Sequence, residues 1–100
     1  MEMPDETARR ESAQLKARLR QETEEADYRW LMSTVQGRRI VWRMLERSGV
    51  YRSSFSSDAM AMAFNEGNRN SGLALLATVS NLSPAEYVEM MEEATNDAAD

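Results

Sequence analysis

The pattern of apolar and polar positions is clearest in the middle of the chain, over residues 37–55. Val41 and Leu45 are four positions apart, and Ile40 and Met44 repeat that spacing one position earlier, so these side chains share one face of a helix. Trp42 lies beside this apolar face. On the opposite side Arg39, Arg43 and Arg47 follow one another at four-residue spacing, with Arg38 adjacent in the sequence. The pattern predicts an amphipathic helix with an apolar face and a basic face.

The start of this central helix is marked by Ser33 and Gln36. A serine followed three positions later by glutamine is typical of a capping box, in which each side chain satisfies a backbone N–H at the helix end. Gly37 then falls in the first turn, where its low helix propensity costs about 1 kcal/mol relative to alanine.

The end of the central helix is marked by Ser48-Gly49. Gly49 is placed to adopt the left-handed conformation of a Schellman cap, with Val50 making the apolar contact that accompanies it. Because Tyr51 and Phe55 extend apolar surface beyond the cap, we expect this loop to be held against the core.

The N-terminal segment, residues 5–26, consists almost entirely of strong helix formers. Its apolar content is thin: Ala8, Leu15 and Leu19 form a narrow stripe, helped by Ala13, Ala17 and Ala26. We interpret residues 1–27 as a charged helical arm. Either the arm is solvated along its length, or Leu15 and Leu19 anchor it in a groove of a partner subunit.

Residues 28–95 are expected to form a compact helical domain. Its core begins with Tyr28, Trp30, Leu31 and Met32, which either belong to a short helix capped by Asp27 or continue the helix of the arm. A later helix is predicted over about residues 58–80, with Asp58 as a cap. Residues predicted to share the apolar face of this helix are Met60, Phe64, Leu75 and Val79.

Small residues in that helix, at Gly67, Ser71 and Gly72, would let another helix approach closely, and a break near residues 68–70 is an alternative. A final helix is predicted to start at Ser83-Pro84-Ala85-Glu86, a capping box with proline in the first turn. We expect this helix to direct Tyr87, Val88 and Met91 toward the core, with Met90 as a further candidate. Its outward residues are Glu86, Glu89, Glu92 and Glu93. Residues 96–100 would form an acidic, frayed tail. The fold class is all-α, with about four helices.

Composition narrows the chemistry that this chain can perform. With 100 residues and 42% apolar residues, the chain is long enough for one domain with a modest core. It contains neither cysteine nor histidine, which removes thiol chemistry, the commonest general base and the commonest transition-metal ligand. No apolar run reaches the length of about 20 residues that a membrane helix needs. We expect a soluble protein made inside the cell.

The net charge of −5 is unevenly distributed. Residues 28–52 contain six arginines and one acidic residue, whereas the segments on either side are acidic. The basic face therefore has two interpretations. Its arginines could contact phosphates of nucleic acid, or they could pair with the acidic C-terminal helix of the same chain or of a neighbour. We favour the second, because the protein is acidic overall and no aromatic residues interleave with the arginines.

Two further segments contain residues of the kinds found in phosphate-binding and metal-binding sites. Residues 65–72, NEGNRNSG, resemble a phosphate-binding loop in composition but match neither G-x-x-x-x-G-K-[ST] nor G-x-G-x-x-G, so a helix-packing notch is the better interpretation. Glu89, Glu92 and Glu93 lack the histidine or the second acidic helix that would make a metal site, and a solvated face explains them. The sequence therefore predicts no catalytic, cofactor-binding or metal-binding residue and no enzyme activity.

The central run RRIVWRMLERSGVYRSSF, followed by DAMAMAFNEGNRNSGLALL and a Pro-x-x-Tyr helix at Pro84–Tyr87, resembles a known family. This family consists of small proteins encoded in tailed-bacteriophage genomes, among the head and tail structural genes, and is named after a protein of a Bordetella podovirus. The resemblance covers about residues 28–93 and leaves the arm outside. It implies a virion or virion-assembly protein.

The resemblance and the residue pattern together favour a non-catalytic virion protein, made in the host cytoplasm. It would be an internal or connector-region component of the head, and ejection with the genome is one alternative for it. It would form homo-oligomers or contact other virion proteins by helix docking. The residues expected at interfaces are Leu15, Leu19, Trp30, Trp42, Arg39, Arg43 and Arg47. The alternative is a nucleic-acid-binding accessory or assembly protein that contacts phosphates through Arg38, Arg39, Arg43 and Arg47.

Overall fold

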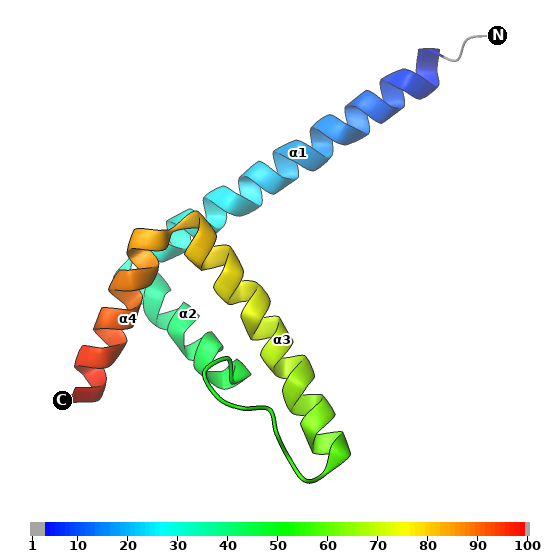
Figure 1. The fold of residues 1–100 in the computed structure, drawn as a ribbon. Helices are drawn as coiled ribbons and strands as arrows, with labels where there is room; N and C mark the ends of the chain where they lie inside the picture. The colour runs from blue at the N-terminus through cyan, green and yellow to red at the C-terminus, as the bar shows by residue number, and fades with distance from the viewer. Residues whose placement is uncertain (1–3, 100) are drawn as a thin grey trace.

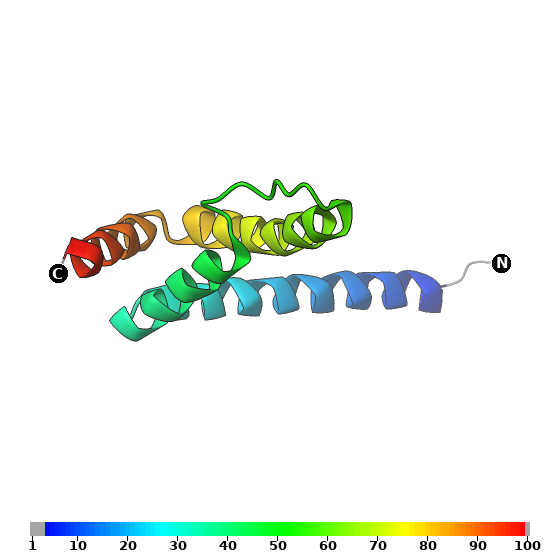
Figure 2. The ribbon, with the colours of Figure 1, turned by 90° about the horizontal axis from the view of Figure 1, so that it is seen from below.

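The computed structural model describes residues 4–99 as four helices, with no strand in that range (Figure 1). These are α1 (Pro4–Met32), α2 (Val35–Ser48), α3 (Ala59–Leu82) and α4 (Pro84–Ala99). The all-α prediction is confirmed. The molecule is elongated and thin, with extents of 69 × 38 × 16 Å: α3 and α4 lie on one side, α1 and the start of α2 on the other, and α1 projects beyond the other helices (Figures 1 and 2).

α1 is a single uninterrupted helix. It continues past Asp27, so the alternative in which the arm helix runs into the domain is the one observed. Every side chain from residue 5 to residue 24 is exposed, and the contacts with α2 and α3 come from the C-terminal end of the helix. Figure 1 shows the rest of α1 extending away from the other helices.

The buried core is small and lies where α2 meets the ends of the other helices. Its buried members are Met32, Val41, Leu45, Val50, Val79 and Met90. Partly buried residues surround them: Tyr28, Leu31, Trp42, Leu73, Leu75, Leu76, Tyr87 and Met91. These two groups include Val41, Leu45, Leu75, Tyr87, Met90 and Met91 among the positions predicted to face inward.

Several predicted core positions are exposed instead. Met60 and Phe64 are 82% and 74% exposed, because α3 is longer than α2 and its N-terminal half extends beyond the end of that helix. Ile40 and Met44 are about half exposed, since α2 is covered around Val41 and Leu45 rather than across its whole apolar face. Two further predictions of burial were wrong, at Trp30 and Val88.

The helix ends agree with local sequence signals except at the start of α2. There the N-cap is Thr34, whose Oγ1 accepts a hydrogen bond from the Gly37 N–H at 2.9 Å. The predicted box of Ser33 with Gln36 is therefore wrong. Ser33 instead donates its hydroxyl to the carbonyl of Trp30, because α1 runs to Met32 and its last turn needs a donor. Asp58 caps α3 as predicted.

α4 begins at Pro84, directly after Ser83, as predicted, and continues to Ala99. It therefore includes residues 96–99, which the sequence suggested as a frayed tail. Asp100 and residues 1–3 lie outside the described residues.

Close approaches at two glycines bring the helices together. A Cβ on Gly37 would lie 1.7 Å from the backbone oxygen of Leu31, and a Cβ on Gly72 would lie 1.8 Å from Oγ of Ser48. Gly72 thus confirms that small residues in α3 admit a neighbouring helix. Gly67 has open space around it, and α3 continues without a break through residues 68–70.

The C-cap of α2 confirms the left-handed glycine. Gly49 has φ of 78° and donates its N–H to the carbonyl of Glu46 at 3.1 Å, and Val50 is buried beside it. We expect Gly49→Val to lower the free energy of unfolding by more than about 1 kcal/mol, because a β-branched side chain resists positive φ. Gly49→Asn is the matched control, since asparagine tolerates this conformation and should retain most of the stability. Urea unfolding of the two variants measures the difference, and equal values would contradict the backbone explanation.

Candidate interaction surfaces

Arg38 joins three helices at the centre of the molecule. Only 5% of the residue is exposed. Its Nε and Nη2 donate to the two carboxylate oxygens of Glu93 on α4 at 2.8 and 3.1 Å, and its Nη1 donates to the carbonyl of Met32 at the end of α1. Glu89 lies 3.5 Å from the same guanidinium. Arg38 is thus paired within its own chain, and its guanidinium is not available for the phosphate contact considered from the sequence.

This ion pair shifts both partners toward their charged forms. The hydrogen bond from Arg38 is the main cause that holds the pKa of Glu93 below its ordinary value, despite partial burial of the carboxylate. The hydrogen bond to Glu93 likewise raises the pKa of Arg38. Arg38 therefore fixes α4 against the end of α1 and the start of α2 by charge-assisted hydrogen bonds.

The lowered pKa of Glu93 predicts a loss of stability in acid. A group with a depressed folded-state pKa stabilises the fold above its unfolded pKa, and this contribution disappears as pH falls through the folded value. The free energy of unfolding should therefore decline below pH of about 4 more steeply for the natural chain than for Glu93→Gln. Urea unfolding at a series of pH values measures both slopes, and parallel slopes would contradict the assignment.

The other arginines of α2 lie on its exposed side. Arg39, Arg43 and Arg47 have exposed side chains, and none of them belongs to an ion pair within the described range. Arg39 borders a small pocket that also contains Glu93 and Asp97 of α4. The basic face predicted from the sequence is therefore divided between Arg38, which is an internal joint, and three arginines that are presented to solvent.

An aromatic pair borders the exposed arginines. Trp42 stacks on Tyr51 with ring centroids 5.4 Å apart, and both rings line an open groove of about 500 Å³ with Glu46, Arg47 and Arg52. Burial, followed by the hydrogen bond with Tyr87, raises the pKa of Tyr51, so its hydroxyl stays protonated at neutral pH. The prediction that no aromatic residues interleave with the arginines was therefore wrong. Trp42 lies beside Arg47, and the fold of the loop brings Tyr51 onto Trp42, which the sequence alone does not show.

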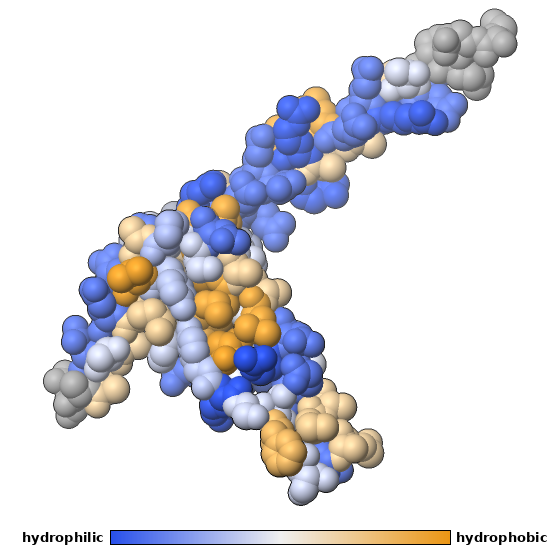
Figure 3. Space-filling view, viewed as in Figure 1, coloured by the Kyte–Doolittle hydropathy of each residue, from blue (hydrophilic) through white to orange (hydrophobic). Residues whose placement is uncertain are grey.

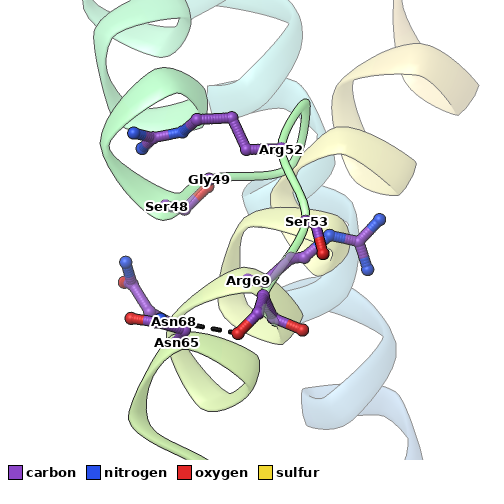
Figure 4. A pocket seen from close by; sticks show the side chains of 8 residues that line it. Ser48, Gly49, Arg52, Ser53, Asn65, Asn68 and Arg69 are labelled. Atoms are coloured by element: carbon purple, nitrogen blue, oxygen red, sulfur yellow. Dashed lines mark hydrogen bonds between the residues drawn. The ribbon is translucent and has the colours of Figure 1, made fainter. Parts of the chain in front are cut away.

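A polar pocket of about 150 Å³ lies where the end of α2, the following loop and α3 meet (Figure 4). Two of its donor side chains bond to the protein itself, whereas Nε of Arg69 is buried without a hydrogen-bond partner among the described residues. Arg52 donates to the carbonyl of Glu46 at 3.0 Å, and Asn68 donates to the carbonyl of Arg47 at 3.0 Å. Figure 4 shows the guanidinium groups of Arg52 and Arg69 pointing to opposite sides of the pocket. Because Arg52 and Asn68 satisfy the last carbonyls of α2, this arrangement is a helix-packing joint, as the sequence suggested for residues 65–72.

The candidate anchors of the arm are exposed. Leu15, Leu19 and Trp30 are 49%, 52% and 70% exposed. Their separations of four and eleven residues place them on one side of α1, whereas Leu31 and Met32, which contact the core, lie on the opposite side. The arm therefore presents its apolar stripe away from the domain to which it is attached. Ala13 and Ala17, which were expected to help this stripe, fall on the other side of the helix.

A second apolar surface was missed by the sequence analysis. Phe55, Met60 and Phe64, which were expected against the core, are each more than 70% exposed and lie at the end of the molecule formed by the loop and the start of α3. In Figure 3, tan and orange side chains lie at the lower end of the molecule, where α3 begins, as well as at its centre. The length difference between α2 and α3 was the only available signal for this surface.

Comparison with known proteins places the chain in a family. A family model described as Bbp19-like phage protein matches residues 28–92. The chain belongs to this family. No curated protein and no solved structure matches it.

The region that matches the Bbp19-like family corresponds to definite elements of the structure. It begins where α1 meets the core and includes α2, α3, α4 as far as residue 92, Arg38 and the aromatic pair, while Glu93 lies one residue beyond it. The exposed part of α1 lies outside it. The match therefore covers most of the residues that pack around the core.

Among residues 4–99, no three acidic side chains are arranged so that they could hold a metal ion. None of the helices in that part of the chain combines the length and apolarity required to cross a membrane.

Proposed function

We propose that this Bbp19-like phage protein is a non-catalytic virion component, located inside the head or at its connector region, that acts by helix docking and oligomerisation. The observation that carries the proposal is the projecting part of α1, which has exposed side chains from residue 5 to residue 24 and an apolar stripe facing away from its own domain. A helix that packs on nothing in its own chain is marginal in water, so its apolar side chains favour a partner.

The arm has local support for a helical conformation before it docks. Glu6 and Arg10 form an ion pair at 2.9 Å, and Glu25 and Arg29 approach to 4.0 Å, each at the favourable spacing of four residues. Such exposed pairs contribute only about 0.3–0.5 kcal/mol each, which helps the helix but does not explain its length. Docking of Leu15, Leu19 and Trp30 supplies the missing apolar burial.

Arg39, Arg43 and Arg47, with Trp42, would form a second contact surface on the domain. Their exposure and the acidic character of the surrounding segments favour contact with acidic surfaces of other virion proteins. In a particle that repeats one contact around a symmetry axis, weak contacts of this kind add up, because the same surface is used by every copy.

Quantitative mass spectrometry tests the proposal on intact virions and on particles that have released their DNA. Detection in intact virions supports a virion component: loss on DNA release then identifies an internal, ejected protein, and retention identifies a fixed connector or shell component. Absence from both particles would overturn the proposal and indicate an assembly factor.

The role of the arm is tested by placing two charged side chains in its apolar stripe. Leu15→Glu with Leu19→Glu should remove the protein from virions while leaving the folded domain intact, because neither side chain contacts the core. Gln14→Glu with Gln21→Glu is the matched control on another side of α1 and should leave incorporation unchanged. Normal incorporation of the leucine variant would overturn docking through the arm.

A second candidate function is nucleic-acid binding, favoured by the aromatic pair of Trp42 and Tyr51 beside Arg47. DNA affinity measured at several salt concentrations tests it. Arg43→Gln with Arg47→Gln should reduce the slope of log affinity against log salt by about 2, since each phosphate contact contributes nearly one unit. Absence of binding at low salt would remove this function.

A further inference from the structure

The apolar stripe of α1 has a regular repeat. Ala8, Leu15, Leu19, Ala26 and Trp30 follow one another at separations of seven, four, seven and four residues. The combined period of eleven residues corresponds to 3.67 residues per turn, so the stripe stays nearly straight along the helix instead of winding around it. A straight apolar stripe of this length can pack against a second helix that lies alongside it.

Charges beside the stripe differ in sign between its two sides. One side carries Arg9, Lys16 and Arg20, and the other carries Glu11, Glu22 and Glu25. The separation is incomplete: Asp5 and Asp27 lie on the basic side, and Arg18 and Arg29 lie on the acidic side. The part of the arm around Leu15 and Leu19 is nevertheless basic on one side and mainly acidic on the other.

We propose that α1 pairs with α1 of a second copy of this chain, in parallel and in register, through this stripe. The partner follows from the charges. In a parallel pair related by a two-fold axis, the mainly basic side of each helix faces the mainly acidic side of the other. Glu11 then lies opposite Lys16 of the second copy, whereas Glu22, one repeat later, lies opposite its Asp27. In an antiparallel pair, basic sides face each other and acidic sides face each other, which disfavours that arrangement.

The attached domains are compatible with this pairing. Tyr28, Leu31 and Met32 contact the core from the side of α1 opposite the stripe. Two paired copies therefore carry their domains on the outer sides of the helix pair, where they do not collide. The inference rests on the proposed function, because it names the partner of the same docking helix.

The pairing is expected to be weak in solution. Two leucines, two alanines and a tryptophan provide the apolar contact, and Ser12 and Thr23 interrupt it. A high local concentration in a particle compensates for weak pairing. Neighbouring copies meet there at effective concentrations of about 1 mM, so even a weak pair forms.

Single-cysteine variants of the full chain test the pairing, because the chain contains no cysteine. Ala8 and Ala26 both lie in the stripe and are equally far from its centre, seven residues outside Leu15 and Leu19 respectively. With oxidised glutathione as oxidant, a parallel pair predicts that Ala8→Cys and Ala26→Cys each form disulfide-linked dimers alone. Ala13→Cys and Ala17→Cys are the matched controls on the opposite side of α1 and should not cross-link.

The outcomes separate the alternatives. Cross-linking only when Ala8→Cys and Ala26→Cys are mixed would indicate antiparallel pairing and overturn the proposal. No cross-linking of any variant, with a monomer at every concentration in sedimentation, would overturn self-pairing and favour a different virion protein as the partner. Because this readout uses purified protein, it is independent of the virion measurement that tests the proposed function.

A charge swap provides a second test of the parallel register. Glu11→Lys should reduce cross-linking of Ala8→Cys severalfold, because it places a lysine opposite the partner's Lys16. Adding Lys16→Glu should restore cross-linking, since opposite charges again face each other. Failure of the double variant to restore it would contradict the register.

Discussion

Gly37→Ala should lower the free energy of unfolding by about 3 kcal/mol, although alanine is the better helix former. The new Cβ would lie 1.7 Å from the carbonyl oxygen of Leu31 and 2.7 Å from its carbonyl carbon. Both atoms belong to the backbone of α1, so no side-chain rotation removes the overlap. The start of α2 must move away from the end of α1, which also displaces Arg38, the next residue along the chain.

Gly67→Ala is the matched control for this substitution. Gly67 also lies inside a helix, but a Cβ there meets nothing within 4 Å. Its replacement should raise the free energy of unfolding by about 0.5–1 kcal/mol through helix propensity alone. Thermal or urea unfolding of the two variants tests the argument. If Gly37→Ala were neutral or stabilising, the close approach of α1 and α2 would be incorrect.

Local features of this fold could be predicted from the sequence where a few adjacent residues determine them. The left-handed cap at Gly49, the N-cap at Asp58 and the start of α4 at Pro84 each depend on residues within one turn. The cap of α2 was misplaced by one residue, from Thr34 to Ser33, because the choice depended on where α1 ends. That end is set by the burial of Met32, which is a tertiary contact.

The surfaces were harder to predict, because burial depends on which part of a helix has a neighbour. Met60 and Phe64 have the spacing of core residues, yet no helix reaches the part of α3 that carries them. Arg38 precedes Val41 by three residues and Leu45 by seven, so the periodicity of α2 places it on the buried side of the helix and not with the exposed arginines. Only the position of Glu93, 55 residues later, shows what pairs with its charge.

Glu93→Leu is the second substitution expected to have a large effect, with a loss of about 3 kcal/mol in the free energy of unfolding. It leaves the buried guanidinium of Arg38 with the carbonyl of Met32 and the more distant Glu89 as its remaining partners. Removing one member of a buried ion pair is usually more damaging than replacing both, because the remaining charge cannot be hydrated.

The double variant Arg38→Met with Glu93→Leu should therefore recover most of the stability that Glu93→Leu loses, since two apolar side chains of similar volume would occupy the joint. Glu92→Leu is the matched control, an exposed glutamate one position earlier on α4, and should change the free energy of unfolding by less than about 0.5 kcal/mol. Urea unfolding of the four chains measures the coupling. If the double variant were less stable than Glu93→Leu, Arg38 would stabilise the junction mainly through Met32 and the packing of its own side chain, and the ion pair with α4 would be secondary.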